Sequence, residues 1–129
     1  MNLKPNVLIF SVYQKSDSTQ KNIITHCGVF QELKRRGLPV VELSGRYAGD
    51  YEYSILIQGF ENRAMVERMC QEFNQECYLE SHNDRASFLV FPDGTRKSIG
   101  TLKAVSKEEA EASDSYSYNP TIDQHFMAK

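Results

Sequence analysis

The chain of 129 residues lacks a strong charge of either sign, with a formal net charge of −2 and an isoelectric point near 5.9. Domains that bind nucleic acid carry an extended basic patch. A protein that imitates a DNA duplex needs a large negative charge. Neither condition is met, so we expect no nucleic-acid partner and exclude DNA mimicry.

Cysteine is scarce, and its spacing excludes two classes of small protein. Cys27, Cys70 and Cys77 form no C-x-x-C pair of the kind that binds zinc. An odd number of cysteines also fits poorly with the disulfide framework of a secreted protein. The apolar run that follows the first six residues is too short for a signal peptide or a membrane span. We therefore expect reduced thiols, a cytoplasmic location and no membrane partner.

The motifs of several enzyme classes are also missing. The sequence holds no phosphate-binding glycine loop, no G-x-S-x-G elbow and no H-E-x-x-H helix. His26, His82 and His125 are scattered without the spacing of metal ligands. His26 falls one turn before Phe30 on a predicted helix, which favours a partly buried structural position. We expect no metal site at these histidines.

Apolar periodicity predicts the order strand, helix, strand, strand, helix, strand up to residue 80. The predicted elements are a strand at 7–13, a helix from 22 to 36, strands at 40–43 and 53–57, a helix at 62–73 and a strand at 76–80. This order is typical of an α+β ferredoxin-like fold, an antiparallel sheet with two helices on one face. A hairpin at 86–99, with Asp93-Gly94 in its turn, is expected to extend the sheet.

The composition changes after residue 103. Residues 107–111 predict a solvated helical turn, and 113–118 mix serine, aspartate and tyrosine without an apolar face. The sequence therefore predicts an α+β domain at residues 1–103 and an extended C-terminal tail at 104–129.

The segment at 44–52 is read as a loop between two neighbouring strands, and it holds the most informative polar residues. Loops held by a rigid sheet are where chemistry concentrates. Glu52 stands before an apolar strand, so its carboxylate is expected at the sheet rim beside buried surface. Tyr47 lies close enough along the chain to share a pocket with it. The alternative is a solvated loop acid and a packing tyrosine.

Three further polar residues occupy unusual positions. Ser11 interrupts an apolar strand, Asn22 begins a helical pattern, and Gln75 follows the second helix. Each has a plain alternative, because Ser11 can face solvent, Asn22 can cap the helix and Gln75 can belong to a turn.

These residues resemble one known family in their order and spacing. The matches are SVY at 11–13, Asn22 with His26, LSGRY at 43–47, Glu52, EFNQEC at 72–77 and, more weakly, TID at 121–123. Together they resemble the bacteriophage S-adenosylmethionine hydrolases, better described as S-adenosylmethionine lyases, over most of residues 6–100. The segment from Tyr47 to Glu52 is shorter than in the phage enzyme.

The resemblance implies an enzyme that needs no cofactor, because a sulfonium is already an excellent leaving group. The carboxylate of S-adenosylmethionine attacks its own γ-carbon and yields methylthioadenosine and homoserine lactone, a reaction that depends on positioning. Glu52 and Tyr47 would be catalytic: Glu52 would hold the ammonium group and complement the sulfonium charge, while Tyr47 would orient the same end. Ser11, Asn22 and Gln75 would bind substrate.

The resemblance also implies an assembly and a biological role. A homotrimer would form its sites between subunits, which allows Tyr47 and Glu52 of one site to come from different chains. Destroying the methyl donor in the host cytoplasm would counter restriction-modification.

Two other functions stay open at this point. Hydrolysis to methylthioadenosine and homoserine would require Glu52 to act as a general base on water. A non-catalytic module that binds a small ligand or a protein would use the same scaffold without turnover, since a fold does not fix function.

Overall fold

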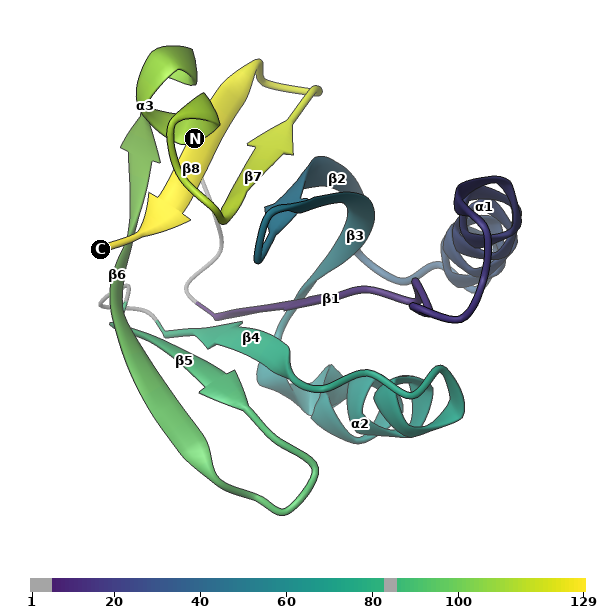
Figure 1. The fold of residues 1–129 in the computed structure, drawn as a ribbon. Helices are drawn as coiled ribbons and strands as arrows, with labels where there is room; N and C mark the ends of the chain where they lie inside the picture. Colours follow the sequence, from purple (N-terminus) through teal and green to yellow (C-terminus); the bar gives the residue numbers. More distant parts are fainter. Residues whose placement is uncertain (1–5, 83–85) are drawn as a thin grey trace.

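The computed structural model describes residues 6–82 and 86–129, and Figure 1 shows their arrangement. Residues 1–5, which belong to the N-terminal stretch before the first apolar run, lie outside this range. The elements in chain order are β1 (Val7–Phe10), α1 (Thr19–Arg35), β2 (Val40–Tyr47), β3 (Asp50–Gln58), the 3-10 turn η1 (Phe60–Asn62), α2 (Arg63–Glu72), β4 (Tyr78–Ser81), β5 (Ala86–Val90), β6 (Arg96–Val105), α3 (Lys107–Glu111), β7 (Tyr116–Asn119) and β8 (Gln124–Ala128).

The strands of the described residues form a closed antiparallel barrel in the order β1-β3-β2-β7-β8-β6-β5-β4. The element order predicted up to residue 80 is confirmed, but the ferredoxin-like fold is wrong. An open sheet would leave β2 and β4 as edges. Here β7 pairs with β2 and β5 pairs with β4, so β5 to β8 join the two edges into a barrel.

Two differences between the predicted and the observed local structure explain this closure. The segment read as a loop at 44–52 continues both strands, which pair from Val40↔Ile57 to Tyr47↔Asp50 around a tight turn. The C-terminal residues read as an extended tail form α3, β7 and β8, and β8 pairs with β6 from Leu102↔Ala128 to Val105↔His125. The predicted boundary at residue 103 falls inside β6, and the division into a domain and a tail stays a prediction.

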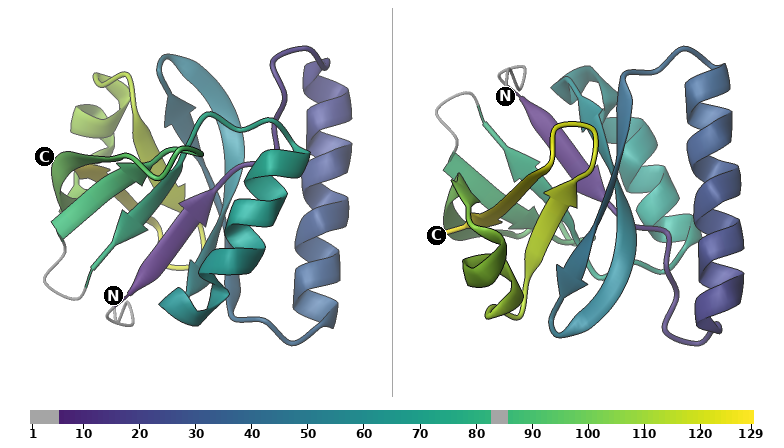
Figure 2. Two further views of the ribbon diagram at one scale, coloured as in Figure 1. Left: turned by 90° about the horizontal axis from the view of Figure 1, so that it is seen from below. Right: turned by 90° about the horizontal axis from the view of Figure 1, so that it is seen from above.

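Local backbone and capping interactions set the two ends of α1. The hydroxyl of Ser18 accepts a hydrogen bond from the Lys21 amide and caps α1. Gly37, with φ of 77°, provides the left-handed residue that ends this helix. α1 and α2 both lie outside the barrel on one side, as the two views of Figure 2 show.

The strand alternation separates two apolar clusters. Side chains of the outer face, including Leu8, Phe10, Ile55 and Ile57, pack under α1 and α2 with Leu33, Val66 and Cys70. Side chains of the inner face fill the barrel interior, and they are Val7, Ile9, Leu43, Leu56, Leu102 and Phe126. A barrel of eight strands is just wide enough for side chains to fill it.

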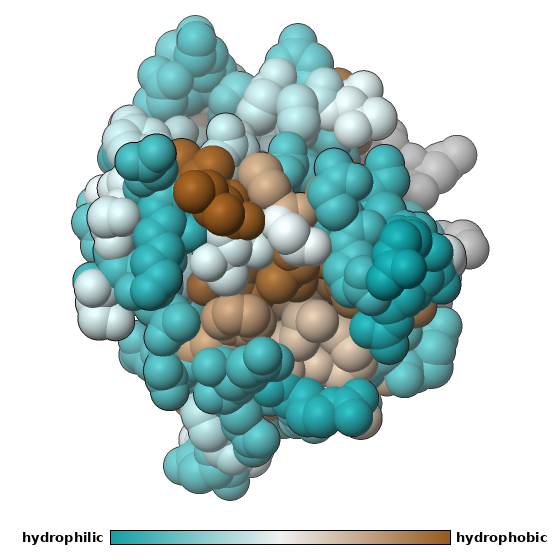
Figure 3. Space-filling model, turned by 90° about the vertical axis from the view of Figure 1, so that its right-hand side faces the viewer, coloured by the Kyte–Doolittle hydropathy of each residue, from teal (hydrophilic) through white to brown (hydrophobic). Residues whose placement is uncertain are grey.

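The side of the molecule that carries α1 exposes apolar residues at its centre, inside a ring of polar residues (Figure 3). On α1, the side chains of Ile23 and Ile24 are 36% and 65% exposed. In residues 6–82 and 86–129, no helix is both long enough and apolar enough to cross a membrane.

Candidate functional site

Tyr47 and Glu52 lie on the same face of one hairpin. The turn between β2 and β3 has positive φ at Ala48 (50°) and Gly49 (91°), which is the type I′ geometry that joins strands through two residues. Glu52 pairs with Gly45, two residues before Tyr47 on β2. Leu43 on this face belongs to the barrel interior, so Tyr47 and Glu52 stand where the interior face reaches one end of the barrel.

Two other polar side chains reach the same end of the barrel. Ser11 follows β1 and continues the inward positions of Val7 and Ile9, while Cys77 precedes β4 and continues the inward position of Leu79. The Ser11 hydroxyl accepts a hydrogen bond from the Tyr13 amide at 3.1 Å and donates to the Tyr53 carbonyl at 3.2 Å.

Glu52 is a partly buried carboxyl group without a cation beside it in the described part of the chain. Burial raises its pKa to about 7, the Asp50 charge also raises the pKa, and hydrogen bonding from Ser11 lowers it in part. A hydroxyl has one proton, so Ser11 donates either to Glu52 or to the Tyr53 carbonyl. The charge of an ionised Glu52 is therefore not balanced by a cation among the described residues, and a cationic ligand could balance it.

Tyr47 is 37% exposed, and its hydroxyl lies 3.4 Å from the Cys77 sulfur. Burial, the hydrogen bond to Cys77 and nearby acids including Glu52 raise the pKa of Tyr47. Burial likewise raises the pKa of the Cys77 thiol. Both groups are therefore neutral at physiological pH, and Glu52 is the titrating member of this cluster.

Asn22 and Gln75 act on the main chain rather than pointing into the cluster. Asn22 accepts from the Gln14 amide at 2.8 Å and donates to the Gln14 carbonyl at 3.0 Å. Gln75 donates to the carbonyls of Tyr13 and Phe73. The two amides hold the segment that follows Ser11 and so fix the position of its hydroxyl.

Gly45 is required by the closeness of β7. A Cβ atom on this residue would lie 2.1 Å from the Tyr116 carbonyl oxygen. Because Gly45 pairs with Ser117 on one side and Glu52 on the other, its missing side chain lets the barrel close beside the cluster.

His26 lies on the outer side of the hairpin and does not join the cluster. The ring is fully buried and stacks on Tyr53 with centroids 5.1 Å apart, and its Nε2 lies 2.9 Å from Glu42. This contact ties α1 to β2. The ring is more deeply buried than the partly buried position predicted from the sequence.

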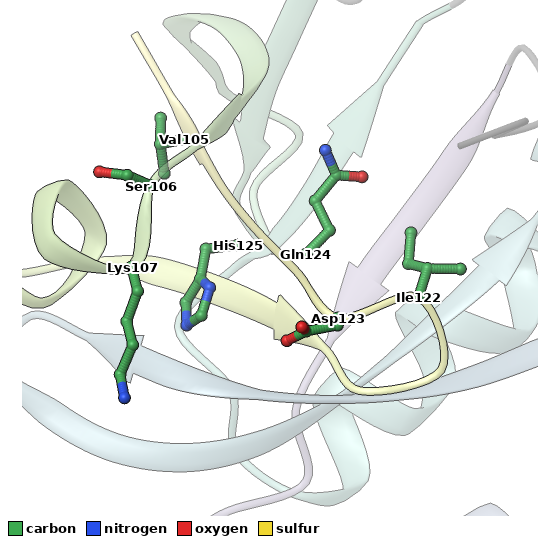
Figure 4. A pocket seen from close by; sticks show the side chains of 7 residues that line it. All are labelled: Val105, Ser106, Lys107, Ile122, Asp123, Gln124 and His125. Atoms are coloured by element: carbon green, nitrogen blue, oxygen red, sulfur yellow. The ribbon is translucent and has the colours of Figure 1, made fainter.

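A separate depression lies near the turn between β7 and β8, lined by residues from the end of β6, the start of α3, that turn and the start of β8 (Figure 4). β7 pairs with β2 near the hairpin tip at Tyr116 and runs away from it, so this depression is remote from Glu52. Two of its polar residues contact Tyr118: Asp123 accepts a hydrogen bond from the Tyr118 hydroxyl at 2.8 Å, and the ring centroids of His125 and Tyr118 lie 4.4 Å apart. We assign it no chemistry.

The cluster therefore consists of Ser11, Tyr47, Glu52 and Cys77, with Asn22 and Gln75 as supports. Of the residues selected from the sequence, Ser11, Tyr47 and Glu52 come together, whereas Asn22 and Gln75 do not reach them directly. Cys77 was missed as a member of the site, although its spacing of two from inward-facing Leu79 is a usable signal. A partly buried carboxylate beside neutral hydroxyl and thiol groups is suited to bind a cation.

Comparison with known protein families matches residues 8–129 to the S-adenosylmethionine lyase family. A search of curated proteins gives no significant match.

Proposed function

Because this chain belongs to the S-adenosylmethionine lyase family, we propose that it degrades S-adenosylmethionine to methylthioadenosine and homoserine lactone at the cluster around Glu52. The protein is an enzyme that acts on S-adenosylmethionine. The observation that carries the proposed site is Glu52, a partly buried carboxylate with a pKa near 7 and no cation beside it among the described residues.

The proposed reaction is an internal displacement. A carboxylate oxygen of the methionine portion attacks the γ-carbon, the bond from that carbon to sulfur breaks, and its electron pair neutralises the sulfonium. No proton is transferred, so the enzyme contributes by folding the substrate into a reactive shape.

The change of charge on the substrate during the reaction determines which of its groups Glu52 should contact. The sulfonium loses its charge in the transition state, so a carboxylate directly against the sulfur would stabilise the substrate more than the transition state. The ammonium group keeps its charge throughout. We therefore place Glu52 at the ammonium group, with Tyr47 and Ser11 orienting the same end of the substrate.

A second reaction has a specific observation in its favour. A carboxyl group with a pKa near 7 is well suited to act as a general base. Glu52 would then activate water, and homoserine would form directly.

The deciding experiment is turnover of S-adenosylmethionine in ¹⁸O-labelled water, with products resolved by chromatography, NMR and mass spectrometry. The lyase reaction gives unlabelled homoserine lactone, and later opening of the lactone places the label in the carboxyl group. Direct hydrolysis places the label in the γ-hydroxyl group of homoserine. No turnover at all would contradict both reactions.

We also propose a homotrimer with its sites between subunits. Exposed Ile23 and Ile24, together with Tyr47 at 37% exposure, support an additional protein surface near the hairpin end. In one chain Tyr47 and Glu52 share a face of the hairpin, and in the proposed trimer a partner chain completes their pocket.

Light scattering on the purified protein measures the assembly, and a mixing experiment tests the shared site. Chains impaired by Tyr47→Phe or by Glu52→Gln, unfolded together and refolded, would recover activity above that of either variant alone if one site takes these residues from different chains. No recovery would assign both residues to one chain, and a monomeric mass would overturn the trimer.

The proposed biological role is to counter restriction-modification by removing the methyl donor from the host cytoplasm. Expression in a restricting host should raise the plating efficiency of an unmodified phage, and Glu52→Gln should abolish the increase. An equal increase with the inactive variant would contradict this role.

A further inference from the structure

The contact between Tyr47 and Cys77 crosses over the middle of the candidate site. Within the barrel the neighbouring strands are β4-β1-β3-β2. Cys77 directly precedes β4, and Tyr47 ends β2. Glu52 on β3 and Ser11, which directly follows β1, lie between them. The contact of 3.4 Å between the Tyr47 hydroxyl and the Cys77 sulfur therefore spans the two strands that carry Glu52 and precede Ser11.

We propose that Cys77 is a positioning residue for the reaction, with its thiol holding the Tyr47 hydroxyl over Glu52. This inference rests on the proposed function of the same site. Tyr47 stands next to the hairpin turn and is 37% exposed, so its ring has room to rotate toward solvent. The contact with Cys77, 30 residues away along the chain, limits that rotation.

The chemistry of a thiol fits a pocket for a sulfonium compound. Sulfonium compounds alkylate thiolates, and the thiolate is the nucleophilic form of cysteine. Burial, Glu76 and Glu52 raise the pKa of Cys77, so the thiol stays protonated. A neutral thiol can position Tyr47 without attacking the substrate.

The other two cysteines lack these features and provide controls. Cys70 is 6% exposed and packs in the outer apolar cluster under α2. Cys27 is exposed on α1. Cys27→Ala therefore removes a thiol without touching the barrel interior.

The first test is a double-mutant cycle on turnover. Losing one hydrogen bond predicts that Cys77→Ala lowers kcat about threefold to tenfold, while Cys77→Ser restores most of the loss and Cys27→Ala changes nothing. In a Tyr47→Phe background, adding Cys77→Ala should have no further effect, because the hydroxyl it positions is gone.

Three results would overturn the proposal: wild-type kcat in Cys77→Ala, an undiminished effect in the Tyr47→Phe background, or a Cys77→Ser variant as impaired as Cys77→Ala. The serine variant keeps the test valid if the alanine variant fails to fold.

The second test does not depend on turnover. Hydrogen bonding from Tyr47 lowers the pKa of the Cys77 thiol. Tyr47→Phe should therefore reduce the thiolate fraction and slow alkylation of Cys77 by iodoacetamide at pH 9 about threefold or more. Mass spectrometry of peptides gives the rate at Cys77, with exposed Cys27 as the internal reference.

An unchanged or faster rate at Cys77 would overturn the proposed contact. If Tyr47→Phe slows alkylation but the wild-type protein does not turn over S-adenosylmethionine, the contact is supported and the proposed function is rejected. Failure of the contact and failure of the proposed function are therefore distinguishable.

Discussion

Glu52 and Glu80 lie on opposite faces of the same barrel and have opposite surroundings. Glu80 alternates with outward-facing Tyr78 on β4 and is 1% exposed. It contacts Arg63 and Arg96, and His82 lies 2.7 Å away. Burial alone would raise its pKa, but hydrogen bonds from His82 and Arg63 and the charges of both arginines lower it.

The comparison shows that burial alone does not give a carboxylate its role. Glu80 is the more buried of the two, yet its charge is already balanced and it joins β4 to α2 and β6. Glu52 is less buried, but its pKa is about 7 because no cation in the described residues balances it. A perturbed carboxyl group without a partner is the better candidate for a functional site.

Replacing Glu52 should have the largest effect, and it acts on activity. Removing a preorganised charge from a site of low polarity predicts that Glu52→Gln lowers kcat/KM roughly 10³-fold. Product formation is measured by chromatography, with Glu72→Gln on the exposed end of α2 as the matched control. A loss below tenfold would contradict the assignment of Glu52.

Replacing Glu80 should act on stability instead. Glu80→Gln leaves two arginines without their carboxylate, which predicts a free energy of unfolding lower by roughly 2 to 4 kcal/mol. Both arginines are more than a third exposed and regain water, so the lower end is favoured. Urea denaturation measures the change, and Glu32→Gln, which removes an exposed pair with Arg35, should cost under about 1 kcal/mol. Equal costs in the two variants would break the comparison.

The dependence of activity on pH should report Glu52. Binding an ammonium group requires the carboxylate, so kcat/KM should rise about tenfold from pH 6 to pH 8, through the pKa near 7. Initial rates across this range, with substrate well below KM, provide the measurement. A rise centred near pH 4.5, the ordinary value for glutamate, would mean that Glu52 is solvated.

Glu52→Gln should also change how the stability of the protein depends on pH. The pKa of Glu52 is about 7 in the folded protein against an ordinary 4.5, so between these values the folded state binds more protons than the unfolded state. Stability from this group is therefore full below pH 4.5 and is lost as pH rises through 7. Relative to the wild type, Glu52→Gln should be more stable at pH 8 than at pH 5 by about 2 to 3 kcal/mol.

The same denaturation series on Glu80→Gln tests the opposite sign. The pKa of Glu80 is lowered, so its contribution is present above pH 4.5 and is lost as pH falls through the folded value. Parallel pH dependences in the two variants would remove the distinction between the carboxylates.

Local signals in the sequence predicted the elements but not the closure of the barrel. Periodicity predicted the helix at 22–36, and α1 begins three residues earlier because Ser18 caps it. The pairing of β2 with β7 joins residues about 70 positions apart, and β7 has four residues, too few for a clear alternation. Ala48-Gly49 forms a two-residue turn without the usual Asn-Gly pair, so the hairpin was read as a loop.

The candidate site was predicted in part, and for a physical reason. Glu52 and Tyr47 are close along the chain, and Ser11 is conspicuous as a hydroxyl that ends an apolar strand. Asn22 was noticed as polar, but sequence does not tell that its amide is occupied by the main chain of Gln14. The spacing of two from Leu79 indicates the face of Cys77, but its contact with Tyr47 depends on the closure of the barrel, which no local pattern reports. The roles of all these residues stay predictions.

Closure of the barrel also determines when the folded protein can form during synthesis on the ribosome. The strand that supports the Tyr47–Glu52 hairpin is β7, and β7 is bridged to the rest of the barrel by β8. A nascent chain that has released α1, the hairpin and β4 still lacks both strands, and such long-range pairing is slow to form. We therefore expect catalytic activity only after residues 116–128 have left the exit tunnel, and a chain truncated before β7 should have none.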